Sequence, residues 1–377
     1  MQSSRYFPIL IIAAIVVVLQ LIVSGTGTGF YLTQLTMSAY YTIVVIGLCM
    51  LMGYAGQISL GHAGFFAIGG YTAAALTTAD MTGLTHGPAG RLCVKAGLFL
   101  QTKDLYGATL AQCNPWLSCA IAVMATVVIA YLIGIPVLRL KGHYLAMATL
   151  GFGTIIYKIV LGTKVFGGAD GISNVPPFFL VQGLRVSGNM TDRIPNYYIA
   201  WFLVIIAALL MHNLVNSRAG RALRSIHGNE DAAEAMGIDT ARYKLHLFVI
   251  SAVLASIAGI FLTHFNGGIG PSEASVMKSV RYVAIVAVGG MANLWGTIVA
   301  GIVLNFLSLR GYFGSYDEAV FGLILVLMML FAPNGIVMNR SWNLLRNRKT
   351  ENSPPHSPSL ERQGEDEKSG KALDAAS

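Results

Sequence analysis

Long apolar stretches that are nearly free of charge recur along this chain and constrain its fold more than any other feature. Charged residues make up 11% of the 377 residues, whereas an average soluble domain has about a quarter. Nine of the charges lie in residues 351–377, so the body of the chain is poorer still. A soluble fold would have too few charges to cover its surface, and the apolar excess excludes a disordered body. The remaining class is a protein that crosses a membrane many times.

The apolar stretches have the lengths that membrane helices need, which is about 20 residues for a full span. Seven stretches approach that length: Phe7–Val23, Tyr31–Met52, Trp116–Leu138, His143–Leu161, Tyr197–Val215, Leu247–Phe265 and Ala319–Val337. Three further elements are Ile58–Leu76, which is rich in Gly and Ala, and the pair Val280–Val288 and Leu294–Leu309, which flank a Gly-containing break. We therefore predict an all-α polytopic membrane protein with about ten (8–10) transmembrane or partly spanning helices.

The loop charges predict the orientation of these helices. If the N-terminus is cytoplasmic and every element crosses, the cytoplasmic loops carry twelve Lys and Arg and the outer loops carry seven. Because Lys and Arg concentrate on the cytoplasmic side of membrane proteins, we expect both termini inside. The basic residues lie between apolar spans and not on one continuous face, so the net charge of +8 does not indicate nucleic-acid binding. Residues 341–377 become rich in Pro, Ser and mixed charge, which predicts a disordered cytoplasmic tail.

Motifs for chemistry are missing from the sequence. It contains no G-x-x-x-x-G-K-[ST], no H-E-x-x-H and no G-x-S-x-G, so we expect no nucleotide site of the P-loop type and no catalytic residues. The four cysteines include no C-x-x-C and no metal-ligand spacing, so we expect no metal. Cys93 and Cys113 fall in one outer loop, where a disulfide and two free thiols are both open interpretations.

The segment from Gly53 to Tyr71 contains six glycines in 19 residues. Small residues let membrane helices approach one another closely, and a break in the backbone is tolerated at depth where it is buried in protein or lines a wet cavity. The segment therefore has two interpretations, a lining of the translocation path and a tight packing interface. Its candidate residues are Gly56, Gln57, Ser59, Gly61, His62 and Gly64.

The longest charged stretch between spans, Ser217–His246, contains the signals of a short helix. Asn229 is a plausible N-cap, and the acidic Glu230 and Asp231 favour the positive end of a helix dipole. Alanines follow, and Gly237 suits the C-terminal end. This predicts a helix of about seven residues, roughly 10 Å long, whose small alanine face fits a groove on another protein. An ordinary solvated loop helix is the alternative.

Several motifs together carry a resemblance to a known family. Asp231-Ala232-Ala233-x-x-x-Gly237 resembles the E-A-A-x-x-x-G coupling loop of ABC importer permeases, with Asp in place of Glu. The runs that resemble the LivM branch of the branched-chain amino-acid permeases are Gly220-Arg221-Ala222-Leu223-Arg224 through Arg242-Tyr243-Lys244, Gly53 through Ala63, Arg139-Leu140-Lys141-Gly142-x-Tyr144, Gly167-Gly168-Ala169-Asp170-Gly171-Ile172, Gly289-Gly290…Leu294-Trp295-Gly296 and Pro333-Asn334-Gly335. The resemblance covers roughly residues 35–340.

This resemblance implies a transmembrane permease domain over residues 1–340, with a cytoplasmic coupling loop at 217–246, in the bacterial inner membrane. It implies an ATP-driven importer of leucine, isoleucine and valine. The implied partners are a paralogous permease, two cytoplasmic ABC ATPases that use the ATP, an external solute-binding protein and the lipid bilayer; this chain itself needs no cofactor. The ATPase-coupling residues would be Gly220, Arg221, Arg224, Asn229, Glu230, Asp231, Ala232, Ala233 and Gly237. A urea or short-chain amide importer is the alternative, and a passive channel and a membrane enzyme are rival classes.

Two outer connections carry acidic residues, Asp170 and Glu273. A charge inside the bilayer costs about 2.5–3.5 kcal/mol on insertion scales, so we expect both at an interface. Asp170 and Gly171 are candidates for docking of the external protein. An ordinary glycine-shaped turn is the preferred interpretation of both connections.

Overall fold

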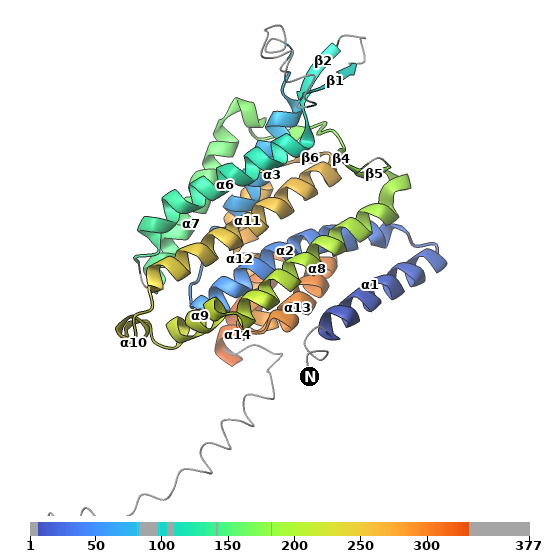
Figure 1. Ribbon diagram of the computed structural model, residues 1–377. Coiled ribbons are helices and arrows are strands. Elements are labelled where there is room, and N and C mark those ends of the chain that lie inside the picture. Colours follow the sequence, from blue (N-terminus) through green and yellow to red (C-terminus); the bar gives the residue numbers. More distant parts are fainter. Residues whose placement is uncertain are drawn as a thin grey trace, which may run out of the picture. The chain divides into compact units, whose positions relative to one another are not determined.

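Helices make up most of the chain that the structure describes (Figure 1). The computed structural model describes residues 7–80, 82, 97, 99–103, 109–140, 142–181 and 183–331, all within one unit, Met1–Val337. Six helices of these residues are long and apolar enough to cross a membrane. They are α1 (Phe7–Gly25), α2 (Phe30–Ala55), α6 (Pro115–Val137), α7 (His143–Gly162), α8 (Arg193–Asn216) and α11 (Thr240–Asn266). The predicted tail at 341–377 and Cys93 lie outside the described residues.

Four shorter helices complete the ten elements that the sequence predicts. They are α3 (His62–Thr78), α12 (Val276–Gly289), α13 (Leu294–Leu309) and α14 (Asp317–Phe331). The predicted all-α polytopic class is therefore confirmed. One boundary was wrong, because the element expected from Ile58 begins only at His62. Gly56 ends α2 in the left-handed region with φ 66°, and no regular helix forms again until His62.

Short strand pairs and single turns of 3-10 helix join the helices. The antiparallel pairs are β1 (Phe99–Lys103) with β2 (Thr109–Cys113), β3 (Ile172–Ser173) with β6 (Gly268–Ile269), and β4 (Phe178–Val181) with β5 (Leu184–Val186). The 3-10 turns are η1 (Lys164–Phe166), η2 (Met190–Asp192), η3 (Pro271–Ala274) and η4 (Gly314–Tyr316). In β2, Cys113 carries a free thiol; Cys93, its suggested partner, lies outside the described residues, so both interpretations stay open.

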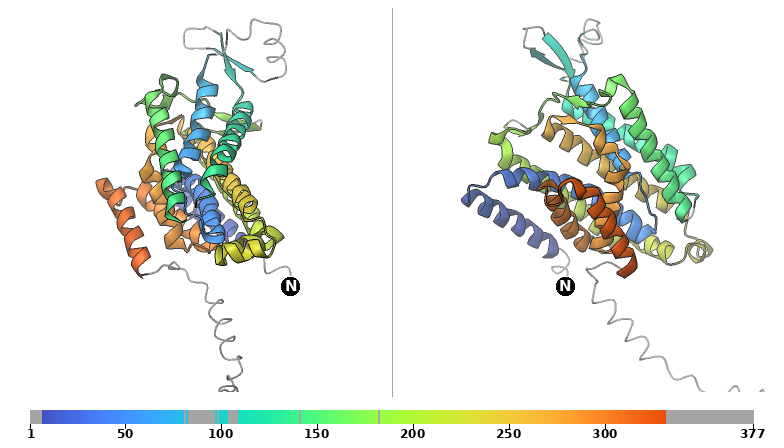
Figure 2. Two further views of the ribbon diagram at one scale, coloured as in Figure 1. Left: turned by 90° about the vertical axis from the view of Figure 1, so that its left-hand side faces the viewer. Right: turned by 180° about the vertical axis from the view of Figure 1, so that it is seen from behind.

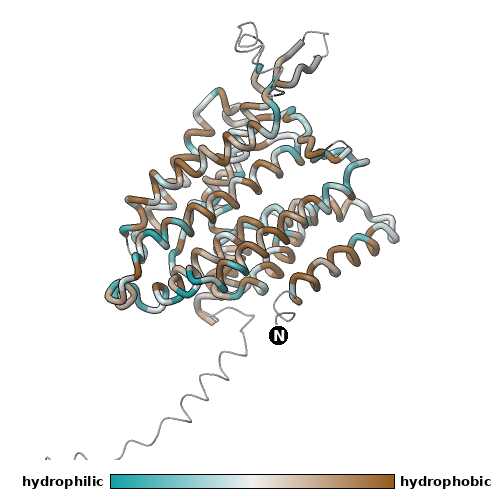
Figure 3. Tube along the Cα trace, in the orientation of Figure 1, coloured by the Kyte–Doolittle hydropathy of each residue, from teal (hydrophilic) through white to brown (hydrophobic). Residues whose placement is uncertain are grey.

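Helix α2 lies at the centre of the bundle, packed against α8, α11 and α13 (Figure 2). Every residue from 38 to 53 is buried, as expected for a helix that is apolar on all sides. In contrast, α1, α6 and α7 bury less than a third of their spans within this chain, and Figure 3 shows them as hydrophobic along most of their length. Lipid or another membrane subunit is the natural partner of such surfaces.

The two faces of the bundle differ in what they carry. The first described residues of α1 and the last of α14 lie at the same end, together with two short helices, α9 (Arg218–Gly228) and α10 (Glu230–Ala235) (Figures 1 and 2). The β1–β2 hairpin lies at the opposite end. This arrangement agrees with an even number of crossings. We call the α10 end the inner face and the hairpin end the outer face, following the charge bias of the loops.

Candidate coupling and translocation sites

The inner face carries a helix that the sequence did not reveal, α9. Ser217 caps it by accepting a hydrogen bond from the N–H of Gly220 at 3.3 Å. Leu223 and Ile226 are buried, and α9 packs against α2, α8 and α11. The available signal was Ser217 ahead of two apolar residues at helical spacing. However, five charged or polar residues in the same segment are typical of a solvated loop.

Two of the predicted coupling residues hold the corner between α8 and α9. A Cβ at Gly220 would lie 2.3 Å from the carbonyl oxygen of Val215, so only glycine fits there. Arg224 donates from Nη2 to the same Val215 oxygen at 2.8 Å and from Nε to the Gly220 oxygen at 3.3 Å. Because the carbonyls at a helix C-terminus lack intrahelical partners, Arg224 stabilises the end of α8. Arg221 is exposed on α9.

Helix α10 forms where the sequence predicts it, with six residues instead of about seven. The side chain of Asn229 accepts from the N–H of Ala232 at 3.0 Å, which is the predicted N-cap. Gly237 has φ 81°, and its N–H donates to the Glu234 oxygen at 2.8 Å. The N–H of Ile238 reaches back to the Ala233 oxygen at 3.1 Å, which completes a left-handed C-terminal stop.

One side of α10 faces the bundle and the other faces out. Ala233 is buried, whereas Asp231 and Ala232 are exposed. Met236 follows the helix and is 81% exposed, the largest exposed fraction among the large apolar residues of the described chain. A single exposed methionine is common on any surface. Here it adjoins the small alanine face, so the end of α10 presents an apolar contact surface.

An ion pair and a hydrogen bond join α10 to the spanning helix α11. Lys244 of α11 forms an ion pair with Glu230, and the Lys244 side chain is only 8% exposed. Thr240 donates from its hydroxyl to the Glu234 carboxylate at 2.6 Å. The two contacts connect both ends of α10 to the first turns of α11, so a displacement of α10 acts directly on a helix that crosses the membrane. Lys244 belongs to the Arg242-Tyr243-Lys244 motif of the family resemblance, but its ion pair with Glu230 could not be inferred from the sequence spacing.

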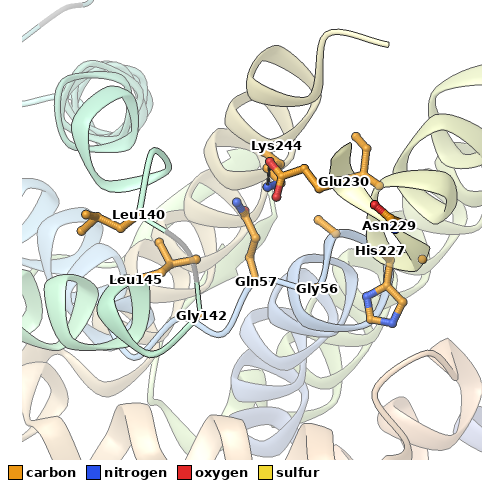
Figure 4. A pocket seen from close by; sticks show the side chains of 12 residues that line it. Gly56, Gln57, Leu140, Gly142, Leu145, His227, Asn229, Glu230 and Lys244 are labelled. Carbon is orange, nitrogen blue, oxygen red and sulfur yellow. Dashed lines mark ion pairs between the residues drawn. The ribbon is translucent and has the colours of Figure 1, made fainter. Parts of the chain in front are cut away.

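An open pocket of about 280 Å³ lies behind α10 (Figure 4). Its lining residues come from the end of α2, the turn before α7, the α9–α10 junction and α11: Ala55, Gly56, Gln57, Leu140, Gly142, Leu145, Ile226, His227, Gly228, Asn229, Glu230 and Lys244. Figure 4 shows the Gln57 side chain directed toward Lys244. Gln57 is 3% exposed, and neither polar atom of its amide has a hydrogen-bond partner among the described residues.

The other candidates in the glycine-rich segment lie in packed protein. His62 is fully buried, with its Nδ1 3.1 Å from the Ser59 hydroxyl and its Nε2 2.7 Å from the Ser251 hydroxyl. A Cβ at Gly61 would lie 2.8 Å from the Thr149 oxygen, and one at Gly64 would lie 3.3 Å from the Phe152 ring. These contacts favour the packing interpretation for Ser59, Gly61, His62 and Gly64. Gly56 and Gln57 line the pocket behind α10.

The outer-face candidates lie far along the chain from this pocket and do not join it. Asp170 is exposed. Gly171 has φ 73°, and a Cβ there would lie 2.2 Å from the Ile269 oxygen, so it permits the close approach to β6. Glu273 sits in a turn, η3, as expected, but the expectation of an interface position was wrong: its side chain is only 18% exposed and contacts Tyr41, inside the long helix α2. However, its carboxylate pairs with Lys278 of α12 at 2.9 Å, a contact that its position in the sequence did not reveal.

A bundle of spanning and half-length helices, with a capped helix fastened to one span at the inner face, defines a multi-pass membrane transport subunit. The chain belongs to the family described as the permease component of branched-chain amino acid transport systems, which it matches over residues 30–333. No solved structure matches it significantly.

Named relatives agree with this membership. The chain is 31% identical over 334 residues to the LivM permease protein of the high-affinity branched-chain amino acid transport system of Escherichia coli, covering 83% of this chain and 71% of LivM. It is 30% identical over 323 residues to the Salmonella typhimurium LivM, covering 80% of this chain and 68% of that protein. It is also 25% identical over 311 residues to the E. coli LivH permease protein, covering 80% of this chain and 92% of LivH.

Proposed function

We propose that this chain is the transmembrane permease subunit of an ATP-driven importer of leucine, isoleucine and valine in a bacterial inner membrane. Family membership and the likeness to LivM support the transport role. The observation that supports the coupling to ATP is the attachment of α10 to α11 through the ion pair between the buried Lys244 and Glu230. A solvated loop helix would need no such anchor.

The mechanism that follows is mechanical. Two cytoplasmic ATPases bind and hydrolyse ATP, and their closure displaces the exposed surface of α10 around Ala232 and Met236. Because Lys244 is buried and Glu230 is only partly exposed, separating them would leave a poorly solvated charge without its partner, so α10 and the start of α11 move as one body. Gln57 lines the same pocket as Glu230 and Lys244, so this motion changes the surroundings of its side chain. The residues of this chain transmit force and perform no covalent step.

The translocation path is completed by other subunits. A second, paralogous permease would cover the apolar surfaces that this chain leaves exposed, as the likeness to both LivM and LivH suggests. An external solute-binding protein would deliver the solute to the outer face, with Asp170 as an exposed contact. Gly171 would hold that loop against β6.

The test is uptake of labelled leucine by cells with and without this gene, measured in excess unlabelled urea and again after ATP depletion. We expect deletion to remove a leucine flux that requires ATP and is unaffected by urea. Unchanged leucine uptake on deletion would contradict the solute and redirect the search to urea and amides. A flux that survives ATP depletion and is lost only on deletion would instead favour a channel.

A further inference from the structure

A broken segment between α11 and α12 lies at mid-depth in the bundle. Helix α12 has 14 residues, about 21 Å at 1.5 Å per residue, which is too short for a hydrocarbon core of about 30 Å. Its Lys278 donates to the Tyr41 hydroxyl at 3.2 Å. Tyr41 lies eleven residues from the outer end of α2 and fourteen from the inner end, or about 16 and 21 Å. The N-terminus of α12 therefore lies near the middle of the bundle.

Opposite charges meet at this depth. The Lys278 ammonium and the Glu273 carboxylate Oε1 are 2.9 Å apart, and each side chain is 18% exposed. The Tyr41 hydroxyl donates to the same Oε1 at 3.0 Å, and the ammonium lies 4.6 Å from the centre of the Tyr41 ring. Ionisable groups at mid-depth in membrane proteins are costly and usually functional.

Polar atoms without a partner occur on the ion pair and on two tyrosines coupled to it. The hydroxyls of Tyr71 and Tyr282 are buried, and neither has a hydrogen-bond partner among the described residues. Both hydroxyls interact electrostatically with Glu273, whose second oxygen, Oε2, is likewise buried and unpaired. Because most buried polar groups in proteins are hydrogen-bonded, three that lack a partner among the described residues, all on the pair or coupled to it, indicate a site for a polar ligand.

We propose that Glu273 and Lys278, with Tyr41, Tyr71 and Tyr282, form a binding site for a zwitterionic α-amino acid on its way through the bundle. The inference rests on the proposed import function and names the chemistry that this chain recognises. The ligand ammonium binds Glu273 at Oε2, and the ligand carboxylate binds Lys278 at the positive end of the α12 dipole. The aromatic rings receive the aliphatic side chain.

The ion pair explains why the ligand should be a zwitterion. An α-amino acid brings one positive and one negative group, so Glu273 and Lys278 can separate and each still has an opposite charge. Urea carries neither charge, so its binding would leave both side chains uncompensated in a poorly solvated place. The site therefore favours amino acids over urea and neutral amides.

Neutralising either charge tests the site in the complete transporter. We expect Glu273→Gln and Lys278→Met each to lower leucine uptake at least tenfold. The matched controls are Glu318→Gln and Lys164→Met, which neutralise exposed charges elsewhere in the chain and should stay within twofold of the wild type. Wild-type leucine uptake in Glu273→Gln would overturn the proposal.

Exchanging the two charges separates binding from structural support. The double variant E273K/K278E keeps an ion pair, so we expect it to restore the membrane abundance and thermal stability of the chain. It reverses the charges relative to the α12 dipole and the tyrosines, so leucine uptake should remain at least tenfold low. Full recovery of uptake would show that the pair is only structural.

Ligand protection gives a second measurement that does not depend on transport. Exposed Ser272, next to Glu273, is replaced as Ser272→Cys in a transporter whose four native cysteines are removed. We expect leucine, and not urea, to slow its reaction with a maleimide, and Glu273→Gln to abolish that protection. Equal protection by leucine and urea, or none, would overturn the site. If the wild type imports leucine, the proposed import function holds whatever the result for the binding site. If it imports urea alone, both the import function and the binding site are contradicted.

Discussion

Individual glycines decide how closely the central helices approach. A Cβ at Gly53 would lie 1.5 Å from the carbonyl oxygen of Met291, and one at Gly69 would lie 2.4 Å from the Ser256 oxygen. Each position therefore allows backbone-to-backbone contact between elements distant in the sequence. The glycine-rich composition of Gly53–Tyr71 predicted close helix packing or a lining of the translocation path. It could not identify Met291 or Ser256 as the contacts, because the sequence around a glycine does not indicate which distant residue packs against it.

A substitution at Gly53 tests whether its close contact with Met291 stabilises the fold. We expect Gly53→Val to destabilise the folded chain by about 3 kcal/mol or more, since overpacking typically costs about 1–3 kcal/mol and here the obstacle is backbone. The measurement is the thermal unfolding of the purified protein in detergent. Gly151→Val is the control, because no atom lies within 4 Å of a Cβ there. Equal stability of the two variants would contradict the tight contact.

At the scale of elements, local sequence signals determine where α10 forms, and long-range contacts determine what it is attached to. Its start, its end and its length follow from Asn229, the alanines and Gly237, all within nine residues, so local propensity was enough to predict it. Its attachment to α11 depends on Lys244 approaching Glu230 across a turn. Helix α9 shows the reverse case. Its sequence is largely polar, and Leu223 and Ile226 become buried only through packing against the rest of the bundle.

The C-terminal stop of α10 offers a test of the coupling role. Gly237 has φ 81° with no atom within 4 Å of a Cβ, so Gly237→Trp should cost about 1–2 kcal/mol in backbone strain and leave the fold intact. We expect leucine uptake to fall at least tenfold while ATP hydrolysis by the complex continues, because the bulky ring obstructs docking.

The matched control is Gly311→Trp, in an outer turn with φ 79° and the same open surroundings. It imposes the same backbone strain away from the inner face, so uptake should stay within twofold of the wild type. Unchanged uptake in Gly237→Trp would remove the coupling role from this helix.

At the scale of the whole molecule, the orientation of the bundle follows from loop charge and is open to direct measurement. Met236, beside α10, and Met190, in η2, are 81% and 77% exposed. We expect Met190→Cys to react with a membrane-impermeant thiol reagent added to intact cells. Met236→Cys should react only after the membrane is permeabilised. The opposite pattern would invert the topology and place α10 outside the reach of ATP.

The sequence by itself determined the class of the protein, its ten helical elements and the short capped helix. Apolar length, helix caps and glycine stops act over a few residues, so they can be read along one segment. Only the tertiary structure decided that His62 is satisfied by Ser251, that Lys244 holds Glu230, and that Glu273 faces Lys278 at mid-depth. The physical reason is that a buried polar group depends on its partner, and packing brings together partners whose sequence positions carry no signal of each other.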